Sequence, residues 1–190
     1  MTISSEHPFA TPDAERDPVR RLRGRVGATV SLWTAGVGAE RAGLTVSSYL
    51  VAGGSPGRVL ALLHPESDLL ERLASSGTAV LQLLEWRHRT VADAFAGLFP
   101  APGGAFRLGK WQQTQWGPRL LGASAWAGLR LAEPPTAQPT VEPAEQPLDR
   151  PAGRPVGWSV LVETVVEHVT LESEETPLVH RRGRYQRPAD

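Results

Sequence analysis

The segment Thr45-Val46-Ser47-Ser48 carries three hydroxyl side chains within four positions of an extended stretch, residues 43–51. Hydroxyl groups of this size can hydrogen-bond the polar edge of a bound ligand without blocking its approach, and the backbone beside them comes close for the same reason. On a half-buried strand they can equally satisfy one another. The residues alone leave both interpretations open.

Ser67 is a second residue that could contact a ligand, because we expect it to be the N-cap of a helix over residues 68–74. The first turn of such a helix offers backbone amides and the positive end of the helix dipole, and both favour an anion. Glu66 and Asp68 place carboxylates at the same point, where they would repel a dianion or bind the amides themselves. These residues alone do not decide whether an anion binds.

Several other kinds of chemistry are excluded. The sequence has no cysteine, so it forms no disulfide bond, thiolate metal site, iron–sulfur cluster or thiol nucleophile. Its histidines form no HxH or HxxxH pair, and we expect four of them to be structural or exposed: His64, His88, His168 and His180. There is no GxGxxG or P-loop motif, and no serine has the context of a nucleophile elbow. We predict no metal site and no serine hydrolysis.

The composition is that of one globular domain without a net charge. Of the 190 residues, 41% are hydrophobic, and the 20 basic and 20 acidic residues cancel. No overall field draws the chain to nucleic acid or to an anionic membrane, and no apolar run approaches the roughly 18 residues that span a bilayer. Residues 1–17 are polar and acidic, unlike a signal peptide. We expect a cytoplasmic protein without nucleic-acid or membrane partners.

Alternation of apolar and polar residues indicates a protein made mainly of β-strands. Strands are predicted over residues 28–33, 43–51, 58–63, 78–84, 123–131 and 157–171, and helices over 18–26, 68–74 and 87–96. The first two strands form a predicted hairpin, and no regular βαβ alternation is present. This order favours an antiparallel barrel with short flanking helices.

The domain organisation follows from the remaining segments. We expect residues 1–17 to be a flexible arm and 18–187 to be the folded domain. Residues 132–156 contain seven prolines and little to bury, which predicts a linker-like insertion. Residues 99–118 are predicted to be an irregular, aromatic-rich loop. The basic face of the helix over 18–26 is expected to be solvated.

Five stretches, in this order, resemble the flavin-reductase-like family of FMN-binding split barrels. They are Ala42-Gly-Leu-Thr-Val-Ser-Ser-Tyr49, Ser75-Ser-Gly-Thr-Ala-Val80, Ala92-Asp-Ala-Phe-Ala-Gly97, Trp111 with Gly117-Pro-Arg-Leu-Leu-Gly-Ala123, and Pro177-Leu-Val-His-Arg-Arg-Gly-Arg-Tyr185. The resemblance covers roughly residues 18–187 apart from the proline-rich insertion.

This resemblance implies a Greek-key split β-barrel that binds FMN non-covalently, as a homodimer with the flavin near the dimer interface. It also implies a role for NAD(P)H as hydride donor, and a monooxygenase as a possible partner that takes the reduced flavin. By resemblance the hydroxyl segment would line the isoalloxazine and ribityl groups, and Ser67 would meet the phosphate. The cofactor-binding residues so assigned are Thr45, Val46, Ser47, Ser48, His64, Ser67, Phe95 and Ala96. Because carboxylates flank Ser67, we expect an arginine, Arg58 or Arg89, to supply the positive charge.

The sequence departs from the family pattern at Gly157-Trp158-Ser159, where many family reductases carry Gly-Asp-His and use the His to handle the nicotinamide. Trp158 could stack on a flavin or nicotinamide face, plug the cleft, or simply pack in the barrel. The sequence therefore leaves two functions: an NAD(P)H-dependent flavin reductase, with Trp158 on the nicotinamide side, or an FMN-binding carrier or partner module with little reductase activity.

Overall fold

A computed structural model describes residues 17–132, 152–173 and 175–188. Residues 1–16 of the expected N-terminal arm and residues 133–151 of the expected insertion lie outside this part. The helices are α1 (Pro18–Arg25), α2 (Asp68–Ser76) and α3 (Arg89–Phe95), with short 3-10 turns η2 (Gly38–Glu40), η3 (Trp86–His88) and η4 (Ala105–Arg107).

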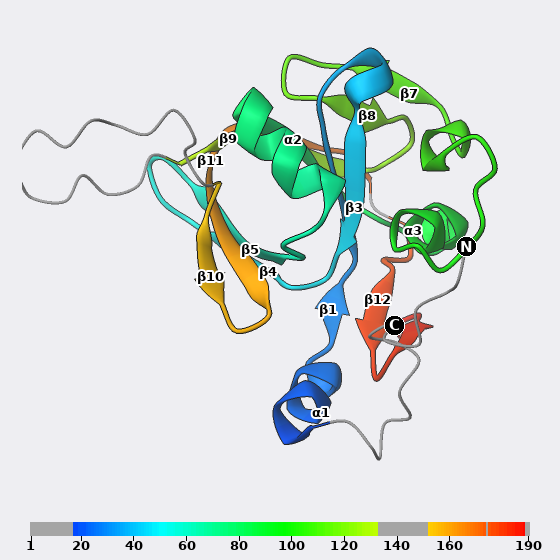
Figure 1. The fold of residues 1–190 in the computed structure, drawn as a ribbon. Helices are drawn as coiled ribbons and strands as arrows, with labels where there is room; N and C mark the ends of the chain where they lie inside the picture. Colours follow the sequence, from blue (N-terminus) through cyan, green and yellow to red (C-terminus); the bar gives the residue numbers. More distant parts are fainter. Residues whose placement is uncertain (1–16, 133–151, 174, 189–190) are drawn as a thin grey trace, which may run out of the picture.

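Within the described residues the main sheet has eight strands, in the order β3-β2-β6-β9-β11-β5-β4, with β10 also paired to β11 (Figure 1). These strands are β2 (Ser31–Ala35), β3 (Ala42–Val46), β4 (Tyr49–Ala52), β5 (Arg58–Leu63), β6 (Thr78–Leu83), β9 (Ala125–Leu131), β10 (Arg154–Val156) and β11 (Ser159–Leu171). Two small sheets complete the fold, formed by β1 (Ala28–Thr29), β12 (Val179–Arg181) and β13 (Arg184–Gln186), and by β7 (Trp111–Gln113) and β8 (Pro118–Leu120).

The main sheet curls because its two edge strands, β3 and β4, are consecutive in the chain. Only Ser47 and Ser48 join them, and the three steps from Val46 to Tyr49 span at most about 11 Å. The opposite edges of the sheet must therefore meet at this link, which is the seam of the split barrel predicted from the sequence. Every strand pair in the main sheet is antiparallel, as expected.

Side-chain alternation in β5 shows why these strands form a barrel wall. Val59, Ala61 and Leu63 are at most 2% exposed, whereas Leu60 and Leu62 between them are only partly buried. The buried set contributes to a core that also contains Trp33, Val46, Leu129 and Val162, closed on one side by Leu69 and Leu73 of α2. Burial of each such side chain stabilises the fold by about 1.5–3 kcal/mol relative to exposure.

A second core lies on the other face of β2, where Leu32 packs with Phe95 of α3, Leu120 of β8 and Leu178. β2 is therefore covered on both faces, and all five of its residues are buried. This cover explains a difference from the sequence prediction. Residues 99–118 were expected to form an irregular loop, but Trp111–Gln113 form strand β7, which pairs with β8 and packs its Trp111 side chain against this core.

The end of the expected insertion also contains a strand. Arg154–Val156 form β10 and pair with Ser159–Leu161 of β11, so the linker-like character predicted for residues 132–156 does not extend to their last positions. The strand forms without burying its side chains, because its backbone pairs with β11 while the side chains of Arg154, Pro155 and Val156 stay exposed.

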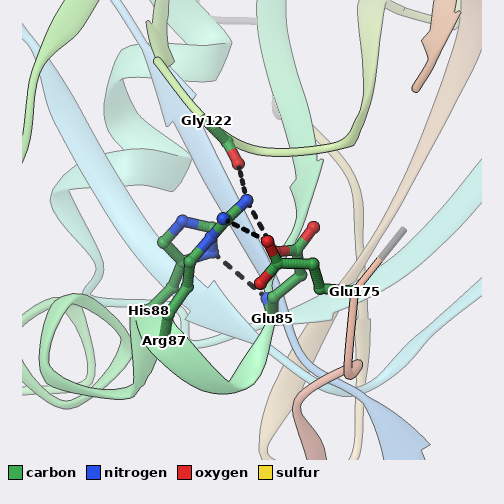
Figure 2. A network of polar contacts seen from close by, with 5 residues as sticks. All are labelled: Glu85, Arg87, His88, Gly122 and Glu175. Carbon is green, nitrogen blue, oxygen red and sulfur yellow. Dashed lines mark hydrogen bonds and ion pairs between the residues drawn. The ribbon is translucent and has the colours of Figure 1, made fainter. Parts of the chain in front are cut away.

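A group of charges links η3 to the C-terminal segment (Figure 2). The Glu85 side chain is 2% exposed, and its carboxylate lies 2.7 Å from the guanidinium of Arg87. Arg87 also lies 2.9 Å from Glu175 and donates a hydrogen bond of 2.8 Å to the carbonyl of Gly122. Beside these groups, Nδ1 of His88 accepts a hydrogen bond of 3.2 Å from the backbone amide of Glu85. Arg87 thus joins three chain segments and compensates a buried carboxylate.

Candidate functional site

The candidate site lies at the end of β5, between two neighbouring strands. On one side the Leu62 amide donates a hydrogen bond of 2.9 Å to the Ser48 carbonyl. On the other side Leu63 pairs with Val160 of β11. His64 therefore leaves the sheet between the β3–β4 link and the turn that joins β10 to β11. The barrel seam, the start of α2 and this turn meet at one edge of the sheet.

The hydroxyl segment presents its side chains in different directions. Oγ1 of Thr45 donates a hydrogen bond of 2.7 Å to the carbonyl of Ala92 in α3. Val46 is 3% exposed and belongs to the first core. Ser47 and Ser48, beyond the end of β3, are partly exposed. Thr45, Ser47 and Ser48 are thus all partly exposed, but the Thr45 hydroxyl is bonded to α3.

The segment from His64 to Ser67 forms the turn into α2. Oγ of Ser67 accepts a hydrogen bond of 3.4 Å from the Leu70 amide, which confirms the predicted N-cap, and donates one of 2.8 Å to the His64 carbonyl. Nδ1 of His64 accepts a hydrogen bond of 3.2 Å from the Glu66 amide. His64, Glu66 and Asp68 are exposed, so the carboxylates at the helix start face solvent. The Leu70 and Glu71 amides bond to Ser67.

Trp158 stands in the turn between β10 and β11, and its side chain is 77% exposed. The preceding Gly157 has a φ of +57°, a left-handed conformation that suits a tight turn without a Cβ. Val156 and Ser159 pair across this turn. β11 begins at Ser159, and its next residue, Val160, pairs with Leu63. The start of β11 therefore lies next to the position where His64 leaves β5.

Phe95 and Ala96 lie at the end of α3, and the Phe95 ring packs against Gly43 of β3. The Phe95 ring is 7% exposed and makes edge contacts with the rings of Phe106 and Trp111, with centroids 4.9 and 5.7 Å away. It presses on Gly43, where an added Cβ would lie 2.6 Å from the ring. Gly43 precedes Ser47 by four residues, about 13 Å along an extended strand. The structure thus brings Ser47, Ser48, His64, Ser67 and Trp158 to one edge but leaves Phe95 in the second core.

The arginines expected to supply positive charge have other partners. Arg58 lies 2.5 Å from Glu163 and at the opposite end of β5 from His64, about 20 Å along the strand. Arg89 donates a hydrogen bond of 3.2 Å to the Trp86 carbonyl and its guanidinium lies over the Trp86 ring.

The cation that does reach the seam is Arg23 of α1, which sequence reasoning missed. Its Nη2 donates a hydrogen bond of 2.8 Å to Oγ of Ser48. These residues are 25 positions apart, and the basic face of α1 was expected to be solvated. Only the packing of α1 beside the seam reveals the contact, and no local sequence pattern signals it.

Two titratable side chains near Ser48 and Arg23, those of Tyr49 and His180, have shifted pKa values. Burial raises the pKa of Tyr49, which follows Ser48, to about 12, against a smaller lowering by a hydrogen bond with Ser31. Burial, and then the charge of Arg23, lower the pKa of His180. The Tyr49 phenol therefore stays protonated and the His180 imidazole neutral near pH 7.

Other features of the described residues lie apart from this edge. They contain no group of three His, Cys, Asp or Glu side chains placed to hold a metal ion. None of their helices is long and apolar enough to cross a membrane. A shallow hollow on α1 is lined by Pro18, Arg21, Leu22 and Arg25 and includes none of the predicted site residues.

The fold and the sequence both match known proteins. A profile of the flavin reductase like domain matches residues 23–189. The FMN reductase (NADH) RutF of Ancylobacter novellus is 29% identical over 113 residues, which are 59% of this chain and 62% of that protein, so the match spans about three fifths of the relative's length. The NADH:FAD oxidoreductase SgcE6 of Streptomyces globisporus superposes with a TM-score of 0.73 at 21% identity, covering 94% of this chain and 96% of the other.

A further solved structure is BorF, the flavin reductase component of a bacterial two-component tryptophan halogenase. It superposes with a TM-score of 0.70 at 18% identity, covering 90% of this chain and 99% of BorF. At this level of identity the two structural matches show a shared fold. The sequence match over residues 23–189 goes further: the chain belongs to the flavin reductase like domain family.

Proposed function

We propose that this protein binds FMN at the barrel seam and is an NAD(P)H-dependent flavin reductase. The observation that carries the proposal is the convergence of Ser47 and Ser48, the start of α2 and Trp158 at the end of β5. When bound, FMN supplies the chemistry, since its ring accepts a hydride from a reduced nicotinamide. The protein's part is to bind the flavin and the nicotinamide, to orient them toward each other and to shield them from water.

The donor set at this edge fits a flavin. Two partly exposed hydroxyls, Ser47 and Ser48, and the backbone beside them can hydrogen-bond the polar edge of a planar ring. The amides at the start of α2 and the guanidinium of Arg23 suit an anionic phosphate. Hydride transfer needs no acid or base on the protein, so this edge can support it without a pair of catalytic acid and base side chains. The names of the relatives, an FMN reductase and an NADH:FAD oxidoreductase, favour the same reaction.

The test of turnover is consumption of NADH or NADPH, followed by the absorbance of the reduced nicotinamide with FMN added to the purified protein. A reductase consumes nicotinamide steadily, in an amount that exceeds the protein. A second function, an FMN carrier or partner module, is favoured by one observation: an exposed Trp158 stands in the β10–β11 turn, at the position where many family reductases carry an Asp. Bound flavin that stays oxidised under excess NADH and NADPH would establish that second function instead.

We further propose a homodimer, based on a cluster of leucines on the outer face of the barrel wall, next to the ion pair of Arg58 and Glu163. Leu50 pairs with Leu60, and Leu62 pairs with Leu161, and paired residues of antiparallel strands face the same side. This side is opposite to the buried core residues of β5, and Leu50 is 72% exposed. In sedimentation, Leu60→Lys should yield a monomer if a second copy covers this face. The matched control is Leu171→Lys, at a residue 75% exposed on another strand.

Two further parts of the proposal concern the partner enzyme and the cellular compartment of this protein. BorF is one component of a two-component halogenase, which supports the idea that this protein passes reduced flavin to a separate monooxygenase-type enzyme. A chain without cysteine suits the reducing cytoplasm, where we place it. Co-purification of flavin-dependent oxygenase activity with the tagged protein from its own cells tests the first idea, and fractionation of those cells tests the second.

A further inference from the structure

Ser31, the first residue of β2, is a polar residue inside the barrel at the seam. It pairs with Val46, the last residue of β3, and paired residues of antiparallel strands face the same side. Its side chain therefore faces the first core, to which Val46 and Trp33 belong, and Ser31 is 0% exposed. Packing alone does not require a hydroxyl at this place, so the contacts of the hydroxyl show what Ser31 does.

The Ser31 hydroxyl has three hydrogen-bond partners. Its Oγ donates a hydrogen bond of 2.7 Å to the Val46 carbonyl and accepts one of 3.1 Å from Nε1 of Trp33. It also forms a hydrogen bond with the phenol of Tyr49. A serine hydroxyl offers one donor and two acceptor positions, so it can serve all three partners at once. Because the Trp33 side chain is itself fully buried, these contacts give the Ser31 hydroxyl a fixed orientation.

Two of the three partners stand at the two ends of the β3–β4 link, which consists of Ser47 and Ser48. Val46 ends β3, and Tyr49 begins β4. These strands are the opposite edges of the main sheet, and they do not pair with each other in the described part of the chain. The Ser31 hydroxyl therefore connects the two edges from inside the barrel, at a place where backbone pairing does not.

We propose that Ser31 is a positioning residue of the flavin site, which holds both ends of the β3–β4 link and so sets where the Ser47 and Ser48 hydroxyls stand. The inference rests on the proposed function and adds to it a residue that does not touch the ligand, since Ser31 is out of reach of solvent. Without its hydroxyl, the ends of the link would move more independently. Hydrogen-bonding groups that are held in place bind a ligand with a smaller loss of conformational freedom.

Three variants of the full chain test this role. Ser31→Ala removes all three hydrogen bonds with a small change in volume. Tyr49→Phe removes only the bond to β4, and it is the milder variant if Ser31→Ala folds poorly. The matched control is Thr164→Val, because Thr164 is also 0% exposed, pairs with the core residue Val59, and donates a hydrogen bond of 3.1 Å to the Val59 carbonyl. Circular dichroism checks the fold of each variant, and urea denaturation measures its stability.

Two measurements are made on each variant, namely hydrogen–deuterium exchange of residues 45–50 without ligand and an FMN titration followed by flavin fluorescence. We expect Ser31→Ala to speed this exchange and to weaken FMN binding by about fivefold or more each, the size of effect expected for the loss of one hydrogen bond. Tyr49→Phe should change both quantities in the same direction by a smaller factor. Thr164→Val should leave both within about twofold, although it also loses a buried hydrogen bond.

A third measurement shows whether Ser31 acts through the link. In the double variant Ser47→Ala, Ser48→Ala, adding Ser31→Ala should weaken FMN binding by less than about twofold, because the hydroxyls that it positions are gone. An undiminished loss in that background would overturn the inference. Unchanged FMN affinity in Ser31→Ala, or exchange no faster than in Thr164→Val, would do the same. If the wild type does not bind FMN, the proposed function fails, and the exchange measurement alone decides whether Ser31 holds the link.

Discussion

The hydroxyl of Thr45 donates a hydrogen bond of 2.7 Å to the Ala92 carbonyl, which ties the last part of β3 to α3. The same carbonyl accepts a hydrogen bond of 2.9 Å from the Ala96 amide. β3 leads directly into the seam, so this contact fixes the strand from which Ser47 and Ser48 extend. Thr45 is therefore in a position to shape the site through the backbone.

We expect Thr45→Val to lower the free energy of unfolding by about 1 kcal/mol, because the hydrogen bond is lost while the carbonyl keeps its second donor. Flavin affinity should fall less than in Ser48→Ala. Urea denaturation and an FMN titration of both variants check this. A variant with wild-type stability and strongly reduced flavin affinity would show that the hydroxyl contacts the ligand instead.

Arg87 compensates the buried carboxylate of Glu85, and its loss should be costly (Figure 2). We expect Arg87→Met to lower the free energy of unfolding by about 1–3 kcal/mol, because a buried charge loses its partner. The control Arg72→Met breaks a pair with the exposed Glu40 and should cost less than about 1 kcal/mol. Adding Glu85→Gln to Arg87→Met should recover part of the loss. Equal effects in the two single variants would contradict the role of burial.

His88 should make stability depend on pH. Burial, and then the charge of Arg87, lower its pKa below the ordinary value near 6.5. Between the folded pKa and about 6.5 the unfolded chain binds more protons, so stability falls as the pH drops through this window. Above it the contribution is fully present.

The variant His88→Gln keeps an acceptor for the Glu85 amide but does not titrate. Its free energy of unfolding should fall less between pH 7 and pH 5 than that of the wild type, with His180 still contributing in both proteins. Parallel pH profiles from chemical denaturation would show that His88 is not the group responsible.

Trp158 is the residue that we expect to limit the proposed reductase turnover. We expect Trp158→His to raise the rate of NADH oxidation with FMN by about tenfold or more, since an imidazole can position a nicotinamide. Stability should stay within about 0.5 kcal/mol, because the side chain is 77% exposed. Trp158→Ala separates the removal of a plug from the gain of an imidazole. An unchanged rate in both variants, with FMN still bound, would mean that this position does not limit turnover.

Sequence patterns predicted those features of the fold that depend on residues close together in the chain, such as helix ends and the bounds of single strands. Ser67 caps α2, and Gly77, with a φ of +69°, ends it, as the residue types indicated. The strand over residues 58–63 has the bounds expected from its sequence. The single strand predicted over residues 28–33 is instead divided at Val30, because its amide bonds to Leu178 outside the main sheet.

The features that sequence reasoning missed depend on long-range packing. β10 forms through backbone pairing with β11. The hydrogen bond between Arg23 and Ser48 forms because α1 packs beside the seam. The hydroxyl segment was recognised through family resemblance, but only the curled sheet shows that its two serines join the opposite edges. The roles of Val46, Phe95 and Ala96 toward a flavin stay predictions.

The most direct test of the flavin site is a titration of FMN with the purified protein, followed by flavin fluorescence. We predict saturable quenching that reaches one flavin per chain, and a weakening of about tenfold or more when Ser47 and Ser48 are both replaced by Ala, which removes two hydrogen-bonding groups. FMN fluorescence that does not respond to the wild-type protein would contradict the assignment of the seam as a flavin site.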